Sequence, residues 1–413
     1  MIDPIQPPRR KNPLLRTRLP TSPSKPRSRK SHGFTLAAAE GRFMLQRCEA
    51  CNTFSYPARE ACASCLSSDL IFVDAPRRGT LLAETTAHVP SDVYFRERAP
   101  WRVGLVKMDC GPTIVAHLHA DCAEGAAVRM SLQLDKSGQA VAFARPEGET
   151  PNMADDKQWR EMTADPKFRR VLVTNGRSVV GQEAVAALKA AGAKTVFVGV
   201  AEPWRPFAGE KLLRGQEGIE VVPLDAADEK SAADLAADIG GKVDILVNTT
   251  EYVRPGGLLD RRGTSIARDE IDQAYLGFIN LAQAFGPAMR MRGADGVNNS
   301  VAWVNVLSVY ALANWPAFGG YSASQAACLS LSHCLRAELR PGGVKVMNLF
   351  TGPVDTEWFQ TVPPPKVAPR AVAQAIVSGL RNGLEEMYVG DVAEEMRQRL
   401  AANPKALERE LDR

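Results

Sequence analysis

Four cysteines in two pairs are the residues of this sequence best suited to hold a metal ion. Cys48 and Cys51 form one C-x-x-C pair, Cys62 and Cys65 form a second, and ten residues separate the pairs. A structural Zn²⁺ takes four ligands at tetrahedral corners, and each C-x-x-C turn supplies two thiolates. The spacing therefore predicts a structural zinc site; a disulfide or redox pair, or a ribbon without metal, are the alternatives. With four protein ligands no coordination position stays open, so we expect the metal to support folding and not catalysis.

Short strands between turn residues follow the cysteine pairs. Five strands are predicted, at residues 79–88, 101–109, 113–119, 128–134 and 140–143. Five strands of this length are enough for a small closed barrel. The polar residues that come next predict a linker.

After Arg170 the pattern changes to strands that alternate with helical stretches. The strands are predicted at residues 171–174, 195–200, 219–223, 244–248, 302–307 and 344–350, with a short one near 388–389. Such alternation is typical of an α/β doubly wound parallel sheet covered on both faces. The predicted domains are a disordered basic tail (1–33), a zinc ribbon (34–75), a barrel (76–146), a linker (147–168), an α/β domain (169–395) and a C-terminal helical tail (396–413).

Composition excludes several classes of function for this 413-residue chain. Residues 1–33 carry nine basic residues, one acid and seven prolines, which predicts disorder. The remaining 42 basic and 46 acidic residues have a charge of −4, so we do not expect a nucleic-acid interface. No apolar run reaches the roughly 18 residues that span a bilayer, so we expect no membrane insertion. Few cysteines and an N-terminus without an apolar stretch lead us to expect reduced thiols and a cytoplasmic location.

The first part of the chain resembles a known family of zinc-ribbon and OB-fold proteins. The resemblance covers residues 34–146 and rests on Arg47-Cys-Glu-Ala-Cys51, Cys62-Ala-Ser-Cys65 and Lys107-Met-Asp-Cys-Gly111. These segments are similar to the DUF35, or acyl-CoA-associated, family, whose members accompany thiolase-like or aldolase subunits that act on acyl-CoA esters. The resemblance implies an OB-fold barrel that contacts a coenzyme A thioester or docks such a partner.

Residues 169–392 resemble the short-chain dehydrogenases/reductases. Val171-Leu-Val-Thr174 and the turn after it look like the family's first βα unit, and Ser308 and Tyr321 have the family's catalytic spacing of thirteen. The resemblance implies a Rossmann fold in which Tyr321 is the general acid/base and Ser308 donates to a carbonyl. It also implies a set of residues that contact the nucleotide: Thr174, Gly176, Gly181, Asp225, Asn248 and Thr356.

Six positions depart from this family's pattern. They are Asn175 and Val179 in place of two turn glycines, Glu251 near the nicotinamide side, Ala274 at the fourth catalytic position, Gln325 in place of the catalytic lysine and Thr351 in place of a proline. A glutamine can hydrogen-bond a ribose but cannot stabilise phenolate by charge. At an unperturbed pKa near 10, only ~0.1% of a tyrosine is ionised at neutral pH. We therefore expect Ser308, Tyr321 and Gln325 to be vestigial or weak, and NAD(P) as a cofactor is in doubt.

The leading hypothesis is an accessory or scaffold subunit in acyl-CoA, β-oxidation-like, metabolism. The ribbon and barrel would engage a thiolase-like or aldolase partner and its CoA ester, and the impaired domain would pair with itself or with an intact dehydrogenase. The helices around Tyr275–Met289 and Ser324–Leu339 are where the resembled family pairs. The alternative is an active NAD(P)-dependent oxidoreductase of a 3-hydroxyacyl-CoA or related alcohol or ketone, with Gln325 as ribose ligand. A third hypothesis is a redox- or metal-responsive regulator that binds DNA through the basic tail.

Overall fold

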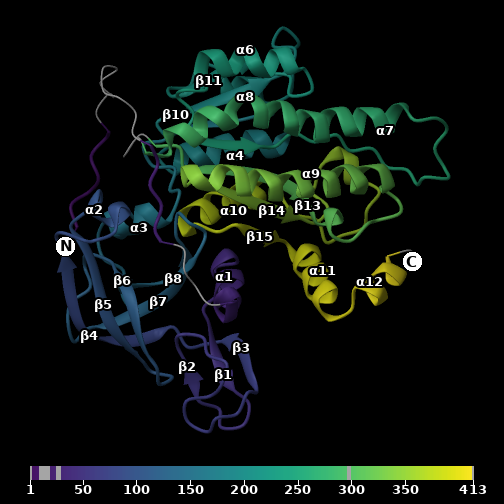
Figure 1. Cartoon of the computed structure of the whole chain (residues 1–413). Helices are drawn as coiled ribbons and strands as arrows, with labels where there is room; N and C mark the ends of the chain where they lie inside the picture. Colours follow the sequence, from purple (N-terminus) through teal and green to yellow (C-terminus); the bar gives the residue numbers. More distant parts are fainter. Residues whose placement is uncertain (1, 9–18, 25–28, 295–298, 412–413) are drawn as a thin grey trace. The chain divides into compact units, whose positions relative to one another are not determined.

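The computed structural model describes residues 2–8, 19–24, 29–294 and 299–411, which form two compact units (Figure 1). The first is built mainly from Thr21–Asp165, and the second from Pro166–Leu380 and Glu385–Arg413. Within these residues, no helix is both long and apolar enough to cross a membrane. The predicted multidomain fold is confirmed, because a ribbon and a barrel lie in the first unit and a parallel sheet forms the second.

The first unit begins with a helix that was not predicted, α1 (His32–Ala39). A three-stranded antiparallel sheet follows, in the order β2-β1-β3, from β1 (Met44–Cys48), β2 (Phe54–Ser55) and β3 (Leu70–Asp74). Phe34, Ala37 and Ala38 recur at helical spacing and pack into the core of the barrel. The ordered structure therefore begins before the boundary expected at residue 34.

A closed five-stranded barrel completes this unit, in the order β4-β5-β6-β8-β7. Its strands are β4 (Arg78–Ala87), β5 (Trp101–Met108), β6 (Thr113–Leu118), β7 (Ala127–Leu134) and β8 (Ala140–Pro146), and α2 (Val93–Arg96) joins β4 to β5. All five predicted strands are present, because apolar residues alternate along them and fill the barrel.

The predicted linker and tail both contain ordered contacts with the barrel. Residues 147–168 include α3 (Lys157–Met162), whose Trp159 packs on Phe143 of β8 with ring centroids 5.2 Å apart. In the tail, Thr21 donates to Glu97 at 2.7 Å and Pro23 is buried. Residues 1, 9–18 and 25–28, which hold much of the predicted disordered tail, lie outside the described residues.

The second unit is a seven-stranded parallel sheet in the order β11-β10-β9-β12-β13-β14-β15. The strands are β9 (Arg170–Val173), β10 (Thr195–Val200), β11 (Ile219–Pro223), β12 (Ile245–Asn248), β13 (Ala302–Ser308), β14 (Lys345–Thr351) and β15 (Glu386–Val389). The helices between and after them are α4 (Val179–Ala190), α5 (Glu210–Leu213), α6 (Glu229–Ile239), α7 (Ser265–Glu270), the π-helix η3 (Ile271–Leu276), α8 (Gly277–Met291), α9 (Gly319–Leu339), α10 (Pro369–Asn382), α11 (Asp391–Ala402) and α12 (Pro404–Glu410). The order confirms the doubly wound sheet, with β9 at the point where the strand order reverses.

The C-terminal helices belong to this unit. The boundary predicted between residues 395 and 396 falls inside α11, and Met396 and Leu407 are buried in the core of the sheet domain. Ala393 of α11 is buried with them, so the described residues of both helices belong to the sheet domain.

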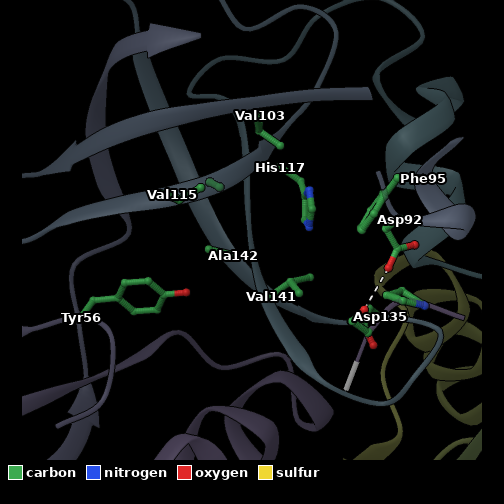
Figure 2. Close-up of a pocket in the computed structure, with 12 residues that line it drawn as sticks. Tyr56, Asp92, Phe95, Val103, Val115, His117, Asp135, Val141 and Ala142 are labelled. Atoms are coloured by element: carbon green, nitrogen blue, oxygen red, sulfur yellow. Dashed lines mark hydrogen bonds between the residues drawn. The ribbon is translucent and has the colours of Figure 1, made fainter. Parts of the chain in front are cut away.

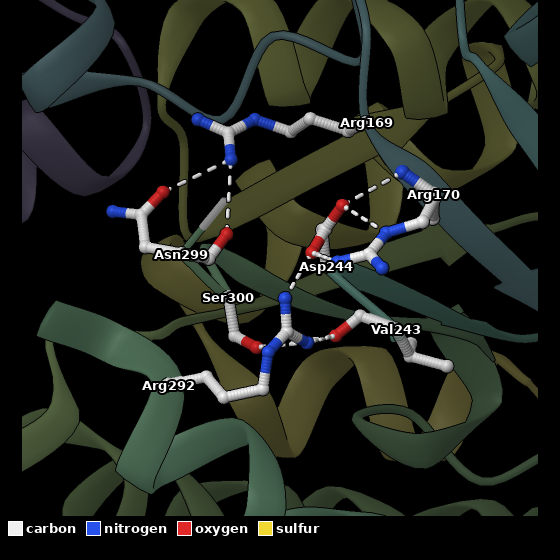
Figure 3. Close-up of polar contacts among 7 residues, drawn as sticks. All are labelled: Arg169, Arg170, Val243, Asp244, Arg292, Asn299 and Ser300. Atoms are coloured by element: carbon white, nitrogen blue, oxygen red, sulfur yellow. Dashed lines mark hydrogen bonds and ion pairs between the residues drawn. The ribbon is translucent and has the colours of Figure 1, made fainter. Parts of the chain in front are cut away.

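A buried polar network ties together the segments that enter the sheet (Figure 3). Both carboxylate oxygens of Asp244 are used: Arg170 donates to them from its backbone N–H at 2.9 Å and from its guanidinium at 3.1 and 2.9 Å, and Arg292 donates to Oδ1. Arg169 donates to the backbone and side-chain oxygens of Asn299, both at 3.0 Å. These contacts join the starts of β9 and β12 to the segment before β13 and so fix the strands whose opposite ends form the site.

Candidate metal centre and active site

The four cysteines predicted as ligands lie together. Their Sγ atoms are all within 4.8 Å of one another, with Cys48 and Cys65 3.6 Å apart and Cys51 and Cys62 3.5 Å apart. Sulfurs bound tetrahedrally to Zn²⁺ at about 2.3 Å are about 3.8 Å apart. The donor set therefore fits one tetrahedral ion with no fifth position open for substrate.

The two C-x-x-C turns share a left-handed residue after the second cysteine and a backbone hydrogen bond to the first cysteine. Asn52 follows the first pair at φ 57° and donates to the carbonyl of Cys48 at 2.9 Å. Leu66 follows the second pair at φ 64° and donates to the carbonyl of Cys62 at 3.0 Å. Left-handed φ at a leucine costs energy. In both turns this conformation accompanies a backbone that brings the two thiols of the pair close together.

The carboxyl ends of β9 and β12 bring two of the predicted nucleotide-contacting residues together. Thr174 Oγ1 donates to Asn248 Oδ1 at 3.2 Å and accepts from the backbone N–H of Thr249 at 3.0 Å. Neighbouring parallel strands end at the same sheet edge, where open α/β folds bind their ligands. Thr174 and Asn248 thus occupy the edge expected of a nucleotide site.

Both glycines of the turn after β9 are needed for packing. A Cβ on Gly176 would lie 2.3 Å from the Val198 side chain, and one on Gly181 would lie 1.8 Å from the Asn175 carbonyl oxygen. Either contact is far inside van der Waals distance, so the strand, turn and helix could not approach as they do. Packing of the turn therefore requires glycine at positions 176 and 181, whether or not a nucleotide binds.

The backbone N–H groups at the start of α4 already donate hydrogen bonds to the side chains of Asn175 and Ser178. Asn175 Oδ1 accepts from the backbone N–H groups of Arg177 at 3.1 Å and Ser178 at 3.3 Å. Ser178 Oγ accepts from the Gly181 N–H at 3.0 Å. Such amides bind pyrophosphate in dinucleotide folds. Val179 is 51% exposed at the first position of the helix, beside these capped groups.

The catalytic candidates meet at the end of β13 and the start of α9, but Gln325 points to backbone. Its Oε1 accepts from the Ser308 N–H at 3.0 Å, and its side chain is 2% exposed. If Gln325 binds a ribose, as expected from the sequence, its side-chain amide nitrogen is the group that can do so, because Oε1 already accepts from Ser308. Ser308 Oγ accepts from the Tyr310 N–H at 3.2 Å, and Tyr321 is buried.

A carboxylate, and not a cation, faces the phenol of Tyr321. The Tyr321 hydroxyl donates to Glu251 Oε2 at 3.4 Å. Glu251 as a residue is partly exposed, but protein surrounds its carboxyl group, and burial raises its pKa to about 7. Burial, and then the charge of Glu251, raise the pKa of Tyr321 well above its ordinary value, while a hydrogen bond with Ser308 acts in the opposite direction. The site therefore favours the neutral phenol, the reverse of what an adjacent lysine does.

Aromatic rings cover Tyr321. Thr356, predicted to contact the nucleotide, directly precedes the short helix η8 (Glu357–Phe359). The ring of Phe359, the last residue of η8, lies edge-on to the Tyr321 ring, with centroids 6.3 Å apart. Phe318 stacks on Phe359 at 5.3 Å, and Trp315 stacks on Phe318 at 4.8 Å. This cover was not anticipated from the sequence, because it joins a loop after β13 to a loop after β14.

Two further predicted positions have local structural roles. Asp225 Oδ1 accepts from the Ala227 N–H at 3.0 Å, and the Asp225 N–H donates to Ser231 Oγ at 2.9 Å. The turn-residue interpretation of Asp225 accounts for these bonds, and its contact with adenine stays a prediction. Ala274 is buried in the π-helix η3 and offers no polar group at the family's fourth catalytic position.

The barrel also has a pocket, of about 400 Å³, on its outer face (Figure 2). Phe95, Val115 and Val141 give it apolar walls. His117 Nδ1 accepts from the Trp101 indole N–H at 2.8 Å, so its Nε2 carries the proton in the neutral ring. Ser24 donates to Asp92 at 3.0 Å across the pocket, next to the buried Pro23.

Comparisons with known proteins assign all three domains. Residues 37–70 match the ChsH2 rubredoxin-like zinc ribbon domain, residues 72–133 the ChsH2 C-terminal OB-fold domain, and residues 169–366 the short chain dehydrogenase family. An uncharacterized oxidoreductase of Mycobacterium tuberculosis is 32% identical over 219 residues, which are 50% of this chain and 60% of that protein. A short-chain dehydrogenase of Penicillium crustosum is 33% identical over 157 residues, 37% of this chain and 54% of that protein. The chain thus spans little more than half the length of these relatives.

Among solved structures, a short chain dehydrogenase from Burkholderia cenocepacia J2315, determined in complex with NADP, is 32% identical. The match has a TM-score of 0.53 and covers 59% of this chain and 97% of that one. A Streptomyces avermitilis short-chain dehydrogenase, at 24% identity and a TM-score of 0.51, shares the fold. The chain therefore belongs to the short-chain dehydrogenase/reductase family through its second unit, which follows a zinc ribbon and an OB-fold domain of the ChsH2, DUF35-like type.

Proposed function

We propose that this protein is an accessory subunit in acyl-CoA, β-oxidation-like, metabolism. The ribbon and barrel engage a thiolase-like or aldolase partner and its CoA ester, and zinc at the four cysteines holds the ribbon. The dehydrogenase-like domain is impaired in hydride transfer and serves subunit pairing. The cytoplasm is the location that we infer for it.

The contact between Tyr321 and Glu251 carries this proposal. Hydride transfer to a ketone needs Tyr321 to give up its proton and form phenolate. Burial of the phenol, together with the Glu251 carboxyl 3.4 Å away, opposes formation of that charge. The capped amides at the start of α4 and the aromatic cover on Tyr321 support the same conclusion from separate parts of the site.

A groove between α8 and α9 supports the pairing role. It measures about 430 Å³, and its lining includes Phe278, Ala282, Leu331 and Leu335. Apolar side chains on two adjacent helices are suited to burial against a second pair of helices.

The impairment of hydride transfer can be tested by removing the carboxylate beside Tyr321 and placing a lysine at position 325. We expect wild type to show weak turnover of NADH with a 3-ketoacyl-CoA, or none, in a reaction that passes hydride to the ketone carbon and a proton to its oxygen. The double variant Glu251→Ala, Gln325→Lys should gain turnover, and Tyr321→Phe in that background should remove it. Ready turnover by wild type that Tyr321→Phe abolishes would contradict the proposal.

Docking is tested separately by size-exclusion chromatography with thiolase-like and aldolase subunits encoded near this chain. We expect one of them to co-elute with the full chain. If none co-elutes, the scaffold role fails, whatever the catalytic result.

An active NAD(P)-dependent oxidoreductase of a 3-hydroxyacyl-CoA or a related alcohol is the second candidate. The placement of Thr174 and Asn248 at the sheet edge, with Ser308 and Tyr321 in the same unit, favours it. So does the NADP bound to the Burkholderia relative. Fluorescence titration with NADH and NADPH separates the two, since this candidate requires tight binding as well as turnover.

A further inference from the structure

Residues 21–24, here called the strap, bond to both ends of the helix α2. Thr21 Oγ1 donates to Glu97 Oε2 at 2.7 Å, and Glu97 is the C-cap of α2. Ser24 Oγ donates to Asp92 Oδ2 at 3.0 Å, and Asp92 is the N-cap of the same helix. Both hydroxyl groups therefore donate to carboxylates, and these charge-assisted hydrogen bonds place the strap along α2.

The guanidinium of Arg98 also holds Thr21. Arg98 donates to Thr21 Oγ1 at 3.3 Å and to Glu161 Oε1 of α3 at 2.8 Å. The same guanidinium lies over the Tyr94 ring, 3.8 Å from the centroid. Tyr94 is fully buried and donates to the same carboxylate oxygen at 3.0 Å. Contacts with α2 and α3 thus determine the position of the Arg98 guanidinium, so Thr21 binds to groups that the fold of the first unit positions by itself.

Between the two hydroxyl contacts, Pro23 borders the pocket on the outer face of the barrel. Pro23 is buried, whereas Ser22 beside it is exposed. Pro23 and Ser24 line the pocket together with Phe95 and His117 (Figure 2). A proline has no N–H that would be left without an acceptor, and its fixed φ lowers the entropy lost when an extended segment binds. The site therefore suits an extended peptide that places a proline between two hydroxyl side chains.

The strap leaves part of the pocket open. The pocket measures about 400 Å³, with Val103, Val115 and Val141 among its apolar walls, and the strap forms one side of it. A peptide that made the same hydroxyl contacts and also placed an apolar side chain in this space would bury more surface than the strap does. Such a peptide can compete with the strap, although the strap is present at an effective concentration of roughly millimolar because it belongs to the same chain.

We propose that this pocket is a docking site for a proline-containing segment of a partner protein, and that the strap occupies the site until that segment displaces it. The partner's segment has a proline between hydroxyl-bearing residues, as the strap does. This inference goes beyond the accessory role proposed above, because it requires neither a CoA ester nor a thiolase-like or aldolase subunit.

Fluorescence anisotropy with a labelled peptide of residues 19–24, Leu-Pro-Thr-Ser-Pro-Ser, tests this on the full chain. The variant Pro23→Asp would bury a charge beside Phe95, so we expect its strap to leave the site. The peptide should bind this variant at least about tenfold more tightly than wild type, in which the strap competes for the same site. A peptide with Pro23→Ala should bind the variant more weakly than the original peptide does.

Two substitutions at the ends of α2 show whether the peptide binds at this site. Both are made in the Pro23→Asp chain. Glu97→Ala removes the carboxylate that accepts from the threonine hydroxyl. Asp92→Ser removes the carboxylate that accepts from the serine hydroxyl, while the new serine still caps α2. Each should weaken peptide binding by about tenfold, as loss of a hydrogen bond to a charged group does.

The matched control for Pro23→Asp is Ser22→Asp, which adds the same charge at an exposed position of the strap. It should bind the peptide within about twofold of wild type. Equal affinity of the peptide for wild type and Pro23→Asp, no binding to Pro23→Asp, or affinity unchanged by both Glu97→Ala and Asp92→Ser would each overturn the proposal. Displacement of the peptide by coenzyme A would overturn it too, because the pocket would then belong to a small molecule. So would a wild-type dimer that the peptide separates in light scattering, since the strap would then bind a second copy. These results are independent of hydride transfer and of partner co-elution.

Discussion

Replacing Glu251 by glutamine should change how the stability of the second unit depends on pH. Burial raises the pKa of Glu251 from 4.5 to about 7 in the folded chain. Between these values the folded carboxyl still holds a proton that the unfolded one has released. Since the folded state then binds more protons, raising the pH destabilises it, and the effect ends above about pH 7.

The magnitude follows from the two pKa values. The gap between 4.5 and about 7 corresponds to about 3 kcal/mol at about 1.4 kcal/mol for each pKa unit. Wild type should therefore lose about 3 kcal/mol of unfolding free energy, relative to Glu251→Gln, as the pH rises through this window. The glutamine amide has no proton to lose, and it can still accept from the Tyr321 hydroxyl.

Urea unfolding between about pH 5 and about pH 8 measures this difference. Tryptophan emission follows the unfolding of both units, because Trp303 is fully buried in the second and Trp101 and Trp159 are buried in the first. Glu220→Gln, an exposed glutamate on the edge strand β11, is the matched control, and its pH dependence should parallel that of wild type. If the difference between wild type and Glu251→Gln stays constant within about 0.5 kcal/mol over this range, the carboxyl is not the buried acid described above.

Three further predictions test other parts of the molecule. Asp244→Asn leaves Arg170 and Arg292 without their anion and should cost about 3 kcal/mol or more in urea unfolding; Asp238→Asn, in an exposed pair with Lys242 at 3.7 Å, should cost little. Cys51→Ser removes one of four thiolates and should abolish stoichiometric zinc, measured by mass spectrometry of metals, whereas Cys334→Ser, outside the cluster, should retain it. Ser178→Ala removes the cap on the Gly181 amide and should lower the urea midpoint by the equivalent of about 1 kcal/mol, whereas an unchanged midpoint would mean that the cap contributes nothing.

Sequence patterns were enough to predict the strands of the barrel and of the parallel sheet, because burial of one or both faces gives each strand a recognisable run of apolar residues. All five barrel strands and all seven strands of the sheet are present. The helices α1 and α3 were missed because each is short and buries only a few apolar residues, among them Phe34 and Trp159. Their helical form depends on a barrel surface that the local sequence does not contain.

The sequence predicted those parts of the candidate site in which the spacing of residues along the chain determines where they lie in the fold. The four cysteines come together because each pair lies on one turn, and Thr174 meets Asn248 because their strands are neighbours. The caps from Asn175 and Ser178 were missed, although Asn and Ser just before a helix signal such bonds. Phe359 could not have been placed over Tyr321, since that contact depends on how two loops pack after the sheet has formed.

The glycines and the polar residues of the turn after β9 have different physical roles. Gly176 and Gly181 are required by the packing seen here, since a Cβ at either would lie within 2.3 Å of a neighbouring atom and the turn would have to shift to admit it. Asn175 and Ser178 are under no such demand, yet they occupy the amides that a pyrophosphate would need. In this chain, packing alone therefore accounts for Gly176 and Gly181. The state of the amides is the better indicator of ligand binding, and here it agrees with the carboxylate beside Tyr321.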